Sequence, residues 1–377
     1  SGSIQNIFSV QWVPSPFVIR TPEGERQVLT AEITSGGLED ASCRISSDAW
    51  PEEEAFQLGD IPVGTYPFEF QLPVADKEIK INVSFKSKTH NKEWKDIVLE
   101  QPKHWTVYLV QHVHTDIGYT RPQTEILAEH LRYIDYALDY CDLTDDYPDD
   151  AKFRWTCEVS WAVREYLKRR PIEQVERFKK RVQEGRIEVT GMFLNMAETA
   201  TESSMAASLQ PLREFKDEFG IEVRTAMQND VNGAAWCLVD YFSGIGLKYL
   251  TMGINKTRSL LPFDLPTAFW WESPSGKRIM AFRAEHYHLG NVWKIHEAQI
   301  GPFRDGLMRY LEQLANKGYP FDRVYAQYSG YQTDNSPPAM KECDLIREWN
   351  ENYVWPRLRS ATAHEFFEWI EKEKGEE

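Results

Sequence analysis

The pattern of hydrophobic and polar residues divides the chain into two parts. From residue 4 to about residue 101, short β-branched and aromatic runs alternate with turns rich in glycine and proline, and in residues 79–85 every second side chain is apolar. A period of two is typical of a strand with one buried face, and several such strands predict a small antiparallel β-sandwich over residues 4–101. We interpret this part as a packing module, with carbohydrate binding as an alternative accessory role.

From residue 104 onward, strand-like runs alternate with helical stretches, which is typical of an α/β fold. Residues 107–110 predict a buried strand, and apolar residues at helical spacing predict a helix over 124–141. Further helices are predicted over 161–169, 172–183 and 204–219, and further strands near 153–156, 187–190, 225–227, 249–252, 279–283 and 324–327. About seven strands with intervening helices predict a seven-stranded (β/α) barrel-like domain over residues 104–377.

Composition narrows the range of partners. The 377 residues carry a net charge of −15 and contain no apolar run approaching the roughly 18 residues that a membrane span needs. Binding a phosphate backbone requires clustered Lys and Arg, so we expect no nucleic-acid partner and no membrane insertion. The 13 Trp and 17 Tyr favour a carbohydrate substrate, because sugar rings stack on such side chains. The composition predicts no particular oligomeric state.

The five cysteines are scattered and odd in number, so neither a disulfide framework nor a cysteine-ligated zinc site is predicted. The sequence has no basic and apolar signal segment, so an export signal was either removed or never existed. A periplasmic or secreted location is favoured over a cytoplasmic one.

The strongest chemical motif directly follows the first strand predicted in the second part. His112, His114 and Asp116 occupy alternate positions, so an extended backbone would project all three side chains to one side. Imidazole and carboxylate ligands suit a zinc-type ion, and three protein ligands leave a position for water or substrate. The alternative is an ordinary polar strand end whose histidines are satisfied by hydrogen bonds.

Two aspartates follow other predicted strands, whose carboxyl ends should meet at one edge of the fold. Asp230 would be a metal ligand, a nucleophile or both; its structural alternative is an Asx turn or a helix N-cap. Asp334 lies in the polar and aromatic segment 328–338. It is either the second carboxylate of a glycosidase pair or the cap of the next helix.

Other polar residues near strand ends are weaker candidates. His286 and His288 could extend a metal site or contact substrate hydroxyls, although core or surface histidines are the simpler explanation. Tyr287 and His288 are candidates for substrate contact. Tyr119 and Tyr331 are further candidates for substrate contact. The weakest candidates are Glu158, Trp161 and Glu198.

With these residues in view, the region from about His104 to Glu371 resembles the N-terminal catalytic domain of glycoside hydrolase family 38, the retaining α-mannosidases. Residues 185–191 look like the family's segment in which a helix-ending glycine precedes an Ile-Glu strand, and residues 269–277 look like its Trp-x-x-Pro-x-Gly hairpin. The family's strand-end motif, His-x-His-x-Asp-x-Gly and an aromatic residue, is matched by His112, His114, Asp116, Gly118 and Tyr119.

This resemblance implies roles for individual residues. His114 and Asp116 would bind Zn²⁺, Asp230 would be both a zinc ligand and the nucleophile, and Asp334 would be the acid/base; the role of His112 stays open. Asp230 would attack the anomeric carbon, and water would then hydrolyse the glycosyl-enzyme with retention. We therefore expect a zinc-dependent glycosidase that hydrolyses α-mannosides or related glycosides.

The resemblance also implies a further histidine ligand that would lie beyond residue 377. Either the chain is a fragment of a longer enzyme, inactive in this truncated form, or it is a short relative with a modified site. Two other functions stay open. One is a metal-dependent hydrolase like the polysaccharide deacetylases, which needs no covalent nucleophile, and the other is a non-catalytic glycan-binding protein.

Overall fold

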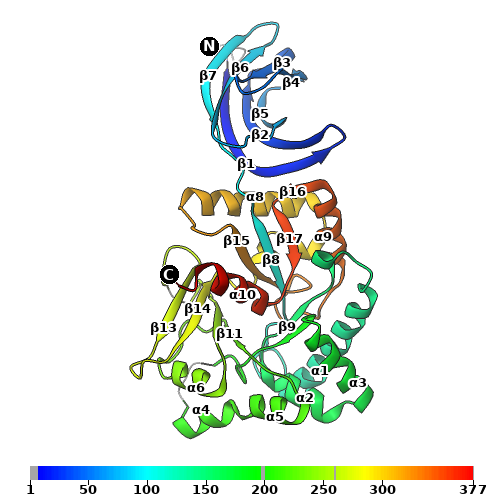
Figure 1. Cartoon of the computed structure of the whole chain (residues 1–377). Coiled ribbons are helices and arrows are strands. Elements are labelled where there is room, and N and C mark those ends of the chain that lie inside the picture. Colours follow the sequence, from blue (N-terminus) through cyan, green and yellow to red (C-terminus); the bar gives the residue numbers. More distant parts are fainter. Residues whose placement is uncertain (1–6, 197–199, 259, 377) are drawn as a thin grey trace. The chain divides into compact units, whose positions relative to one another are not determined.

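The computed structural model describes residues 7–196, 200–258 and 260–376 (Figure 1). The chain forms two compact units, Ser1–Thr106 with Asn350–Arg357, and Val107–Trp349 with Leu358–Glu377. None of the helices in the described ranges combines the length and the apolar character that a membrane crossing requires.

The first unit contains two four-stranded sheets that share one hydrophobic core. Their strand orders are β16-β1-β2-β5 and β4-β3-β6-β7, and the pairings are antiparallel. The predicted strand over residues 79–85 is confirmed, because alternate residues of β6 are buried. The strands are β1 (Phe8–Thr21), β2 (Gly24–Ser35), β3 (Leu38–Ser46), β4 (Glu54–Ile61), β5 (Gly64–Pro73), β6 (Ile79–Lys86), β7 (Asn91–Leu99) and β16 (Tyr353–Trp355).

The second unit is an α/β structure built on three separate sheets. β9 pairs with β10 in parallel; β11, β12 and β14 are parallel with β13 antiparallel at the edge; and β8 lies between β15 and β17. The strands are β8 (Thr106–Gln111), β9 (Trp155–Cys157), β10 (Ile187–Val189), β11 (Thr225–Asn229), β12 (Tyr249–Gly253), β13 (Thr267–Glu272), β14 (Arg278–Ala284), β15 (Arg323–Tyr328) and β17 (Arg357–Ser360).

The α/β prediction is thus confirmed, but no closed barrel forms among the described residues. The reason lies in the short strands: β9 and β10 pair over only three residues each. The backbone hydrogen bond from Gly191 N to Thr225 O (2.9 Å) links the segment after β10 to the next sheet without extending the ladder.

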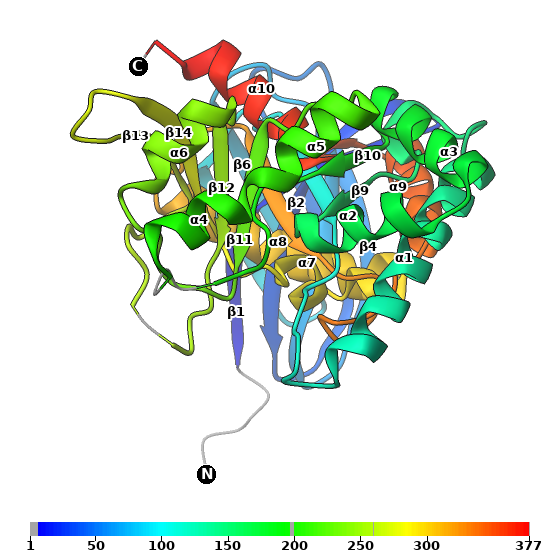
Figure 2. The same ribbon diagram turned by 90° about the horizontal axis from the view of Figure 1, so that it is seen from below.

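Helices follow most of these strands. α1 packs against α2 and α3, and α2 packs against α5; Figure 2 shows these helices beside β9 and β10. The single helix predicted over residues 204–219 is wrong, because two helices occupy this segment and Pro211, which lacks an amide hydrogen, lies in the first turn of the second. The helices are α1 (Gln123–Leu143), η2 (Asp149–Ala151), α2 (Ser160–Arg169), α3 (Ile172–Gln183), α4 (Glu202–Ser208), α5 (Gln210–Phe219), α6 (Leu238–Ile245), α7 (Leu289–Val292), η3 (Ile295–Glu297), α8 (Ile300–Asn316), α9 (Lys341–Asn352) and α10 (Ala363–Lys374).

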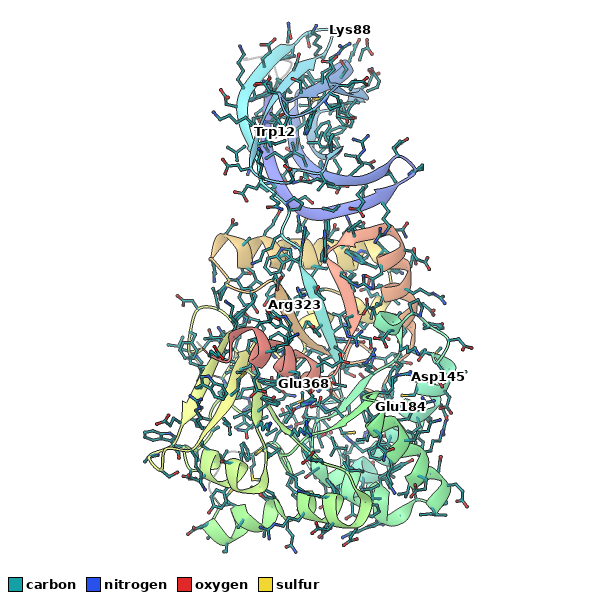
Figure 3. All side chains as sticks on the ribbon, in the orientation of Figure 1. Trp12, Lys88, Asp145, Glu184, Arg323 and Glu368 are labelled. Atoms are coloured by element: carbon teal, nitrogen blue, oxygen red, sulfur yellow. The ribbon has the colours of Figure 1, made fainter. Side chains whose placement is uncertain are left out.

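A group of ion pairs fixes α3 to the segment after α1. Arg181 donates hydrogen bonds to Asp145 at 2.9 Å and to Glu184 at 2.7 Å, and Figure 3 shows these two carboxylates side by side. Arg186 donates to Asp145 at 2.8 Å. Hydrogen bonds from Arg181, opposed by burial and helped by Arg186, lower the pKa of Asp145 to about 2.

Candidate active site

The polar residues predicted after the strands gather at the carboxyl ends of β8, β9, β11 and β15. β8 ends at Gln111, so the predicted His-x-His-x-Asp motif lies in the loop that follows the strand. Backbone hydrogen bonds hold this loop: His112 N donates to Tyr328 O (3.0 Å), and His114 N donates to Asp334 O (2.9 Å). The second bond brings the loops after β8 and β15 together.

His114, Asp116 and Asp334 form a group whose ligand atoms all lie within 4.8 Å of one another. Nε2 of His114 lies 3.5 Å from Oδ1 of Asp116. Asn335 Nδ2 donates to Oδ2 of Asp116 (2.9 Å) and to Oδ1 of Asp334 (3.0 Å), so one amide holds both carboxylates. One imidazole nitrogen and two carboxylates are suitable ligands for a divalent metal ion.

Glu158 lies directly after β9 and contacts both histidines of the motif. His114 Nδ1 lies 2.9 Å from Oε1 of Glu158, and His112 Nδ1 lies 2.6 Å from Oε2. Nδ1 of His112 has no hydrogen-bond partner of good geometry, so its contact with Glu158 is a close approach rather than a hydrogen bond. His112 also uses Nε2 to contact the carbonyl oxygen of Tyr287 at 2.8 Å. All three ionisable side chains are buried.

The charges of this cluster stabilise one another. Burial opposes protonation of His114, but the Glu158 carboxylate and hydrogen bonds to Asp116 and Glu158 outweigh it and hold the pKa of His114 well above its ordinary value. Burial opposes ionisation of Glu158, but the two imidazoles outweigh it and keep its pKa well below the usual range. The hydrogen bond to His114, only partly opposed by burial, lowers the pKa of Asp116.

Asp230 follows β11 in a left-handed backbone conformation, with φ of 64°. Asn255 Nδ2 donates to its Oδ1 at 2.5 Å, and Arg258 Nε lies 3.7 Å from the same oxygen. A positive φ at a residue other than glycine is strained and is often found at functional sites. Asp230 does not belong to the close group of His114, Asp116 and Asp334.

Comparison with known proteins identifies the family of this chain. Residues 104–377 match the family described as the glycosyl hydrolases family 38 N-terminal domain. The chain belongs to glycosyl hydrolase family 38. No match was found among curated proteins.

Two solved structures from Enterococcus faecalis resemble this family 38 chain. The α-mannosidase of strain V583 is 17% identical with a TM-score of 0.57, and the similarity covers 71% of this chain and 29% of that one. A family 38 protein is 16% identical with a TM-score of 0.46, covering 72% and 28%. The first similarity shows the fold alone. Because the similarity covers only 29% and 28% of those two chains, this chain spans less than a third of the length of either structure.

The residues predicted to contact substrate differ in their exposure. Tyr119 is 83% exposed and Tyr331 is 44% exposed, so both rings are accessible. Tyr287 is only 4% exposed, because its ring stacks on His114 with the centroids 4.6 Å apart. Burial raises the pKa of Tyr287, as do the carboxylates of Asp230 and Asp334, so its hydroxyl stays a donor. That hydroxyl donates to Oδ2 of Asp334 at 3.2 Å.

His288 is half-buried, and this burial lowers its pKa to about 4, so it is neutral at physiological pH. Asp230 and Asp334 share an electrostatic environment, because the charges of both carboxylates raise the pKa of Tyr287 and oppose the lowering of the pKa of His286 by burial.

Trp161 is buried in a small apolar cluster with Ile126. Glu198 lies outside the described residues.

Three asparagines that the sequence did not single out contact the carboxylates of the candidate site. Asn335 bridges the two carboxylates of the close group, Asn255 holds Asp230, and Asn195 donates to Glu158. Asn195 also accepts from the backbone of Asn229 at 3.0 Å. Asparagines in loops are common in any sequence, so their only signal was a position shortly after a strand end.

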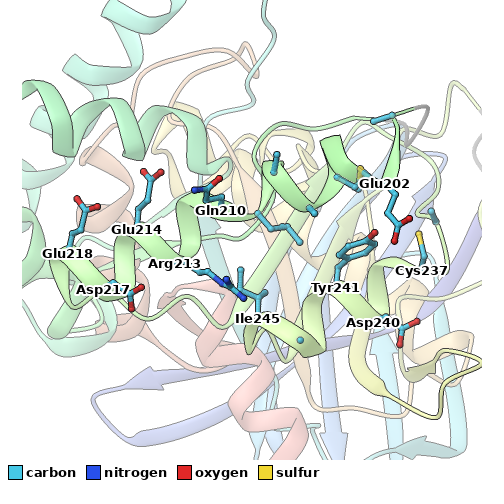
Figure 4. A pocket seen from close by; sticks show the side chains of 17 residues that line it. Glu202, Gln210, Arg213, Glu214, Asp217, Glu218, Cys237, Asp240, Tyr241 and Ile245 are labelled. Carbon is cyan, nitrogen blue, oxygen red and sulfur yellow. The ribbon is translucent and has the colours of Figure 1, made fainter.

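A separate groove of about 1140 Å³ lies between α4, α5 and α6 (Figure 4). Its lining includes apolar side chains, such as Met205 and Ile245, and acidic side chains, such as Glu202 and Glu214. It contains none of the residues that the sequence assigned to catalysis, metal binding or substrate binding.

Proposed function

We propose that this family 38 domain is a zinc-dependent retaining glycosidase that hydrolyses α-mannosides. The observation that carries the proposal is the close group of His114, Asp116 and Asp334 within the region that matches the family. Its donor set suits Zn²⁺ and leaves a position for substrate. His114 fits this role because Glu158 engages Nδ1, so Nε2 faces the carboxylates. When bound, zinc supplies the positive charge that holds adjacent sugar hydroxyls.

Asp230 is the proposed nucleophile. Asn255 and Arg258 both contact Oδ1, which leaves Oδ2 for attack on the anomeric carbon. The attack breaks the glycosidic bond, and the leaving oxygen needs a proton from a second carboxylic acid.

Asp334 has two candidate roles, and it cannot perform both at the same time because they require different protonation states. As a member of the close group it would be an ionised metal ligand. As the acid/base it would carry a proton and give it to the leaving oxygen, within reach of the Tyr287 hydroxyl. A substitution that preserves size, Asp334→Asn, separates the two roles.

The first experiment measures zinc content and hydrolysis of 4-nitrophenyl α-mannoside by the 377-residue chain. We expect bound zinc and hydrolysis in the unchanged chain, loss of zinc in Asp116→Asn, and loss of hydrolysis with zinc retained in Asp230→Ala. Asp305→Asn, an exposed aspartate of α8, is the matched control and should change neither quantity. A chain that binds no zinc and cleaves no mannoside would refute the proposal, and release of acetate from acetylated sugars would replace it with a deacetylase.

The second experiment compares leaving groups in Asp334→Asn. If Asp334 is the acid, zinc stays bound and the rate falls far more for an alkyl mannoside than for a 2,4-dinitrophenyl mannoside, whose leaving group needs no proton. If Asp334 is a ligand, zinc is lost and both rates fall together.

A further inference from the structure

Glu158 is a fully buried carboxylate in the middle of the site, and five groups that donate or carry protons surround it. His114 Nδ1 (2.9 Å), Thr115 N (3.2 Å) and Asn195 Nδ2 contact Oε1. Asn229 Nδ2 (2.7 Å) and His112 Nδ1 (2.6 Å) contact Oε2. These partners come from the loops after β8 and β10 and from the end of β11.

We propose that Glu158 is the positioning residue of the metal site, holding His114 by Nδ1 so that Nε2 points at Asp116 and Asp334. This inference rests on the proposed zinc-binding function. A histidine ring has two nitrogens, and the hydrogen bond made by one of them decides which one is left to bind a metal. With Nδ1 engaged by Glu158, the nitrogen that faces the carboxylates is Nε2.

Further contacts prevent the ring of His114 from turning. Tyr287 stacks on it with an interplanar angle of 30°, and the Tyr287 hydroxyl donates to Asp334. His112 spans the gap between Glu158 and the carbonyl oxygen of Tyr287. Glu158, His114, Tyr287 and His112 therefore form a closed ring of contacts, in which Tyr287 contributes its ring and its backbone carbonyl, and Glu158 contacts both histidines.

The surroundings require a carboxylate at position 158. A carboxylate accepts hydrogen bonds at both oxygens, which matches donors on both sides. In Glu158→Gln one carboxylate oxygen becomes an amide nitrogen, which is a donor. In one orientation this nitrogen would face Asn229 and His112, and in the other it would face His114 and Thr115. In either orientation, one donor would meet another donor. The substitution therefore releases at least one contact while it preserves the size of the side chain.

The experiment measures zinc affinity by competition with a chelating dye, using the 377-residue chain and its Glu158→Gln variant. We expect zinc affinity to fall roughly 10- to 100-fold, the usual effect of losing the partner of a ligating histidine. Glu188→Gln is the matched control, because Glu188 is also buried at a neighbouring strand but bonds to Thr156 and the His364 amide. The zinc affinity of Glu188→Gln should equal that of the unchanged chain.

A spectroscopic measurement separates positioning from general destabilisation. The visible absorption bands of bound Co²⁺ should change in Glu158→Gln and stay unchanged in Glu188→Gln. If Glu158→Gln does not fold, Glu158→Asp keeps the charge with a shorter reach, and the same measurements should move in the same direction. If the unchanged chain binds no zinc, the proposed function fails and this inference falls with it. If that chain binds zinc and the Glu158 variants bind it equally with the same Co²⁺ spectrum, only the positioning role is refuted.

Discussion

Glu342 should make the stability of the protein depend on pH. This glutamate lies in the first turn of α9, the helix that follows the loop of Asp334, and its side chain is completely buried. Within the described part of the chain, neither carboxyl oxygen has a hydrogen-bond partner outside its own residue. Burial raises the pKa of Glu342 to about 8 from an ordinary value of 4.5. The folded protein therefore holds a proton here at neutral pH, and the unfolded chain does not.

The sign and size of the effect follow from proton linkage. A raised carboxyl pKa contributes stability that is fully present below pH 4.5 and is lost as the pH rises to about 8. Each pH unit in this window costs about 1.4 kcal/mol of unfolding free energy, or roughly 5 kcal/mol in total. Glu342→Gln mimics the protonated side chain. Its stability should match that of the unchanged chain near pH 4.5 and exceed it by a growing margin up to pH 8.

Urea unfolding followed by tryptophan fluorescence at several pH values between 4.5 and 9 measures this difference. Glu351→Gln, an exposed glutamate of the same helix, is the control and should leave the pH profile unchanged. A carbon NMR titration of the Glu342 carboxyl should give a midpoint near pH 8. Parallel profiles for Glu342→Gln and the unchanged chain, or a carboxyl that titrates near pH 4.5, would refute the reasoning.

Three further substitutions test the packing of the second unit. Gly253→Ala places a methyl group 2.6 Å from Cβ of Tyr287, so we expect a loss of roughly 1–3 kcal/mol in unfolding free energy and weaker zinc binding; Gly301→Ala, which meets open space, should cause neither. Thr362→Ala removes the N-cap of α10 and should cost about 1 kcal/mol in denaturant unfolding. Phe178→Ala leaves a cavity in the core and should cost roughly 3–5 kcal/mol by the same measurement; a loss below 1 kcal/mol would contradict tight packing there.

The order of strands and helices in the second unit was largely predictable from the sequence. Buried strands such as β8 and β11 are marked by apolar runs, and the carboxyl ends of parallel strands bring distant polar residues to one edge. The break between α4 and α5 was missed because helical spacing continues across it, although Pro211 was a local signal. β16 was missed because it pairs with β1 across more than 300 residues, and such pairing has no local signature.

The close group of the site was predictable in part. His114 and Asp116 were marked by their spacing after a strand. Asp334 was assigned to acid/base chemistry, and it lies beside His114 because hydrogen bonds join two loops, from His114 N to Asp334 O and from Asn335 to Asp116. Loop-to-loop contacts of this kind depend on the final packing, so residue spacing alone does not predict them.

The burial of each carboxylate cannot be predicted from the sequence, and burial distinguishes the roles that we propose for the carboxylates. Glu158, Asp116 and Asp230 all follow strands and look alike in sequence, but their side chains are 0%, 25% and 23% exposed. A carboxylate without exposure cannot meet a sugar, and it is stable there only because surrounding donors satisfy it. The partly exposed pair can meet an ion or a substrate. In the proposed function, the inner carboxylate therefore orients the histidine, and the two outer carboxylates take part in the chemistry.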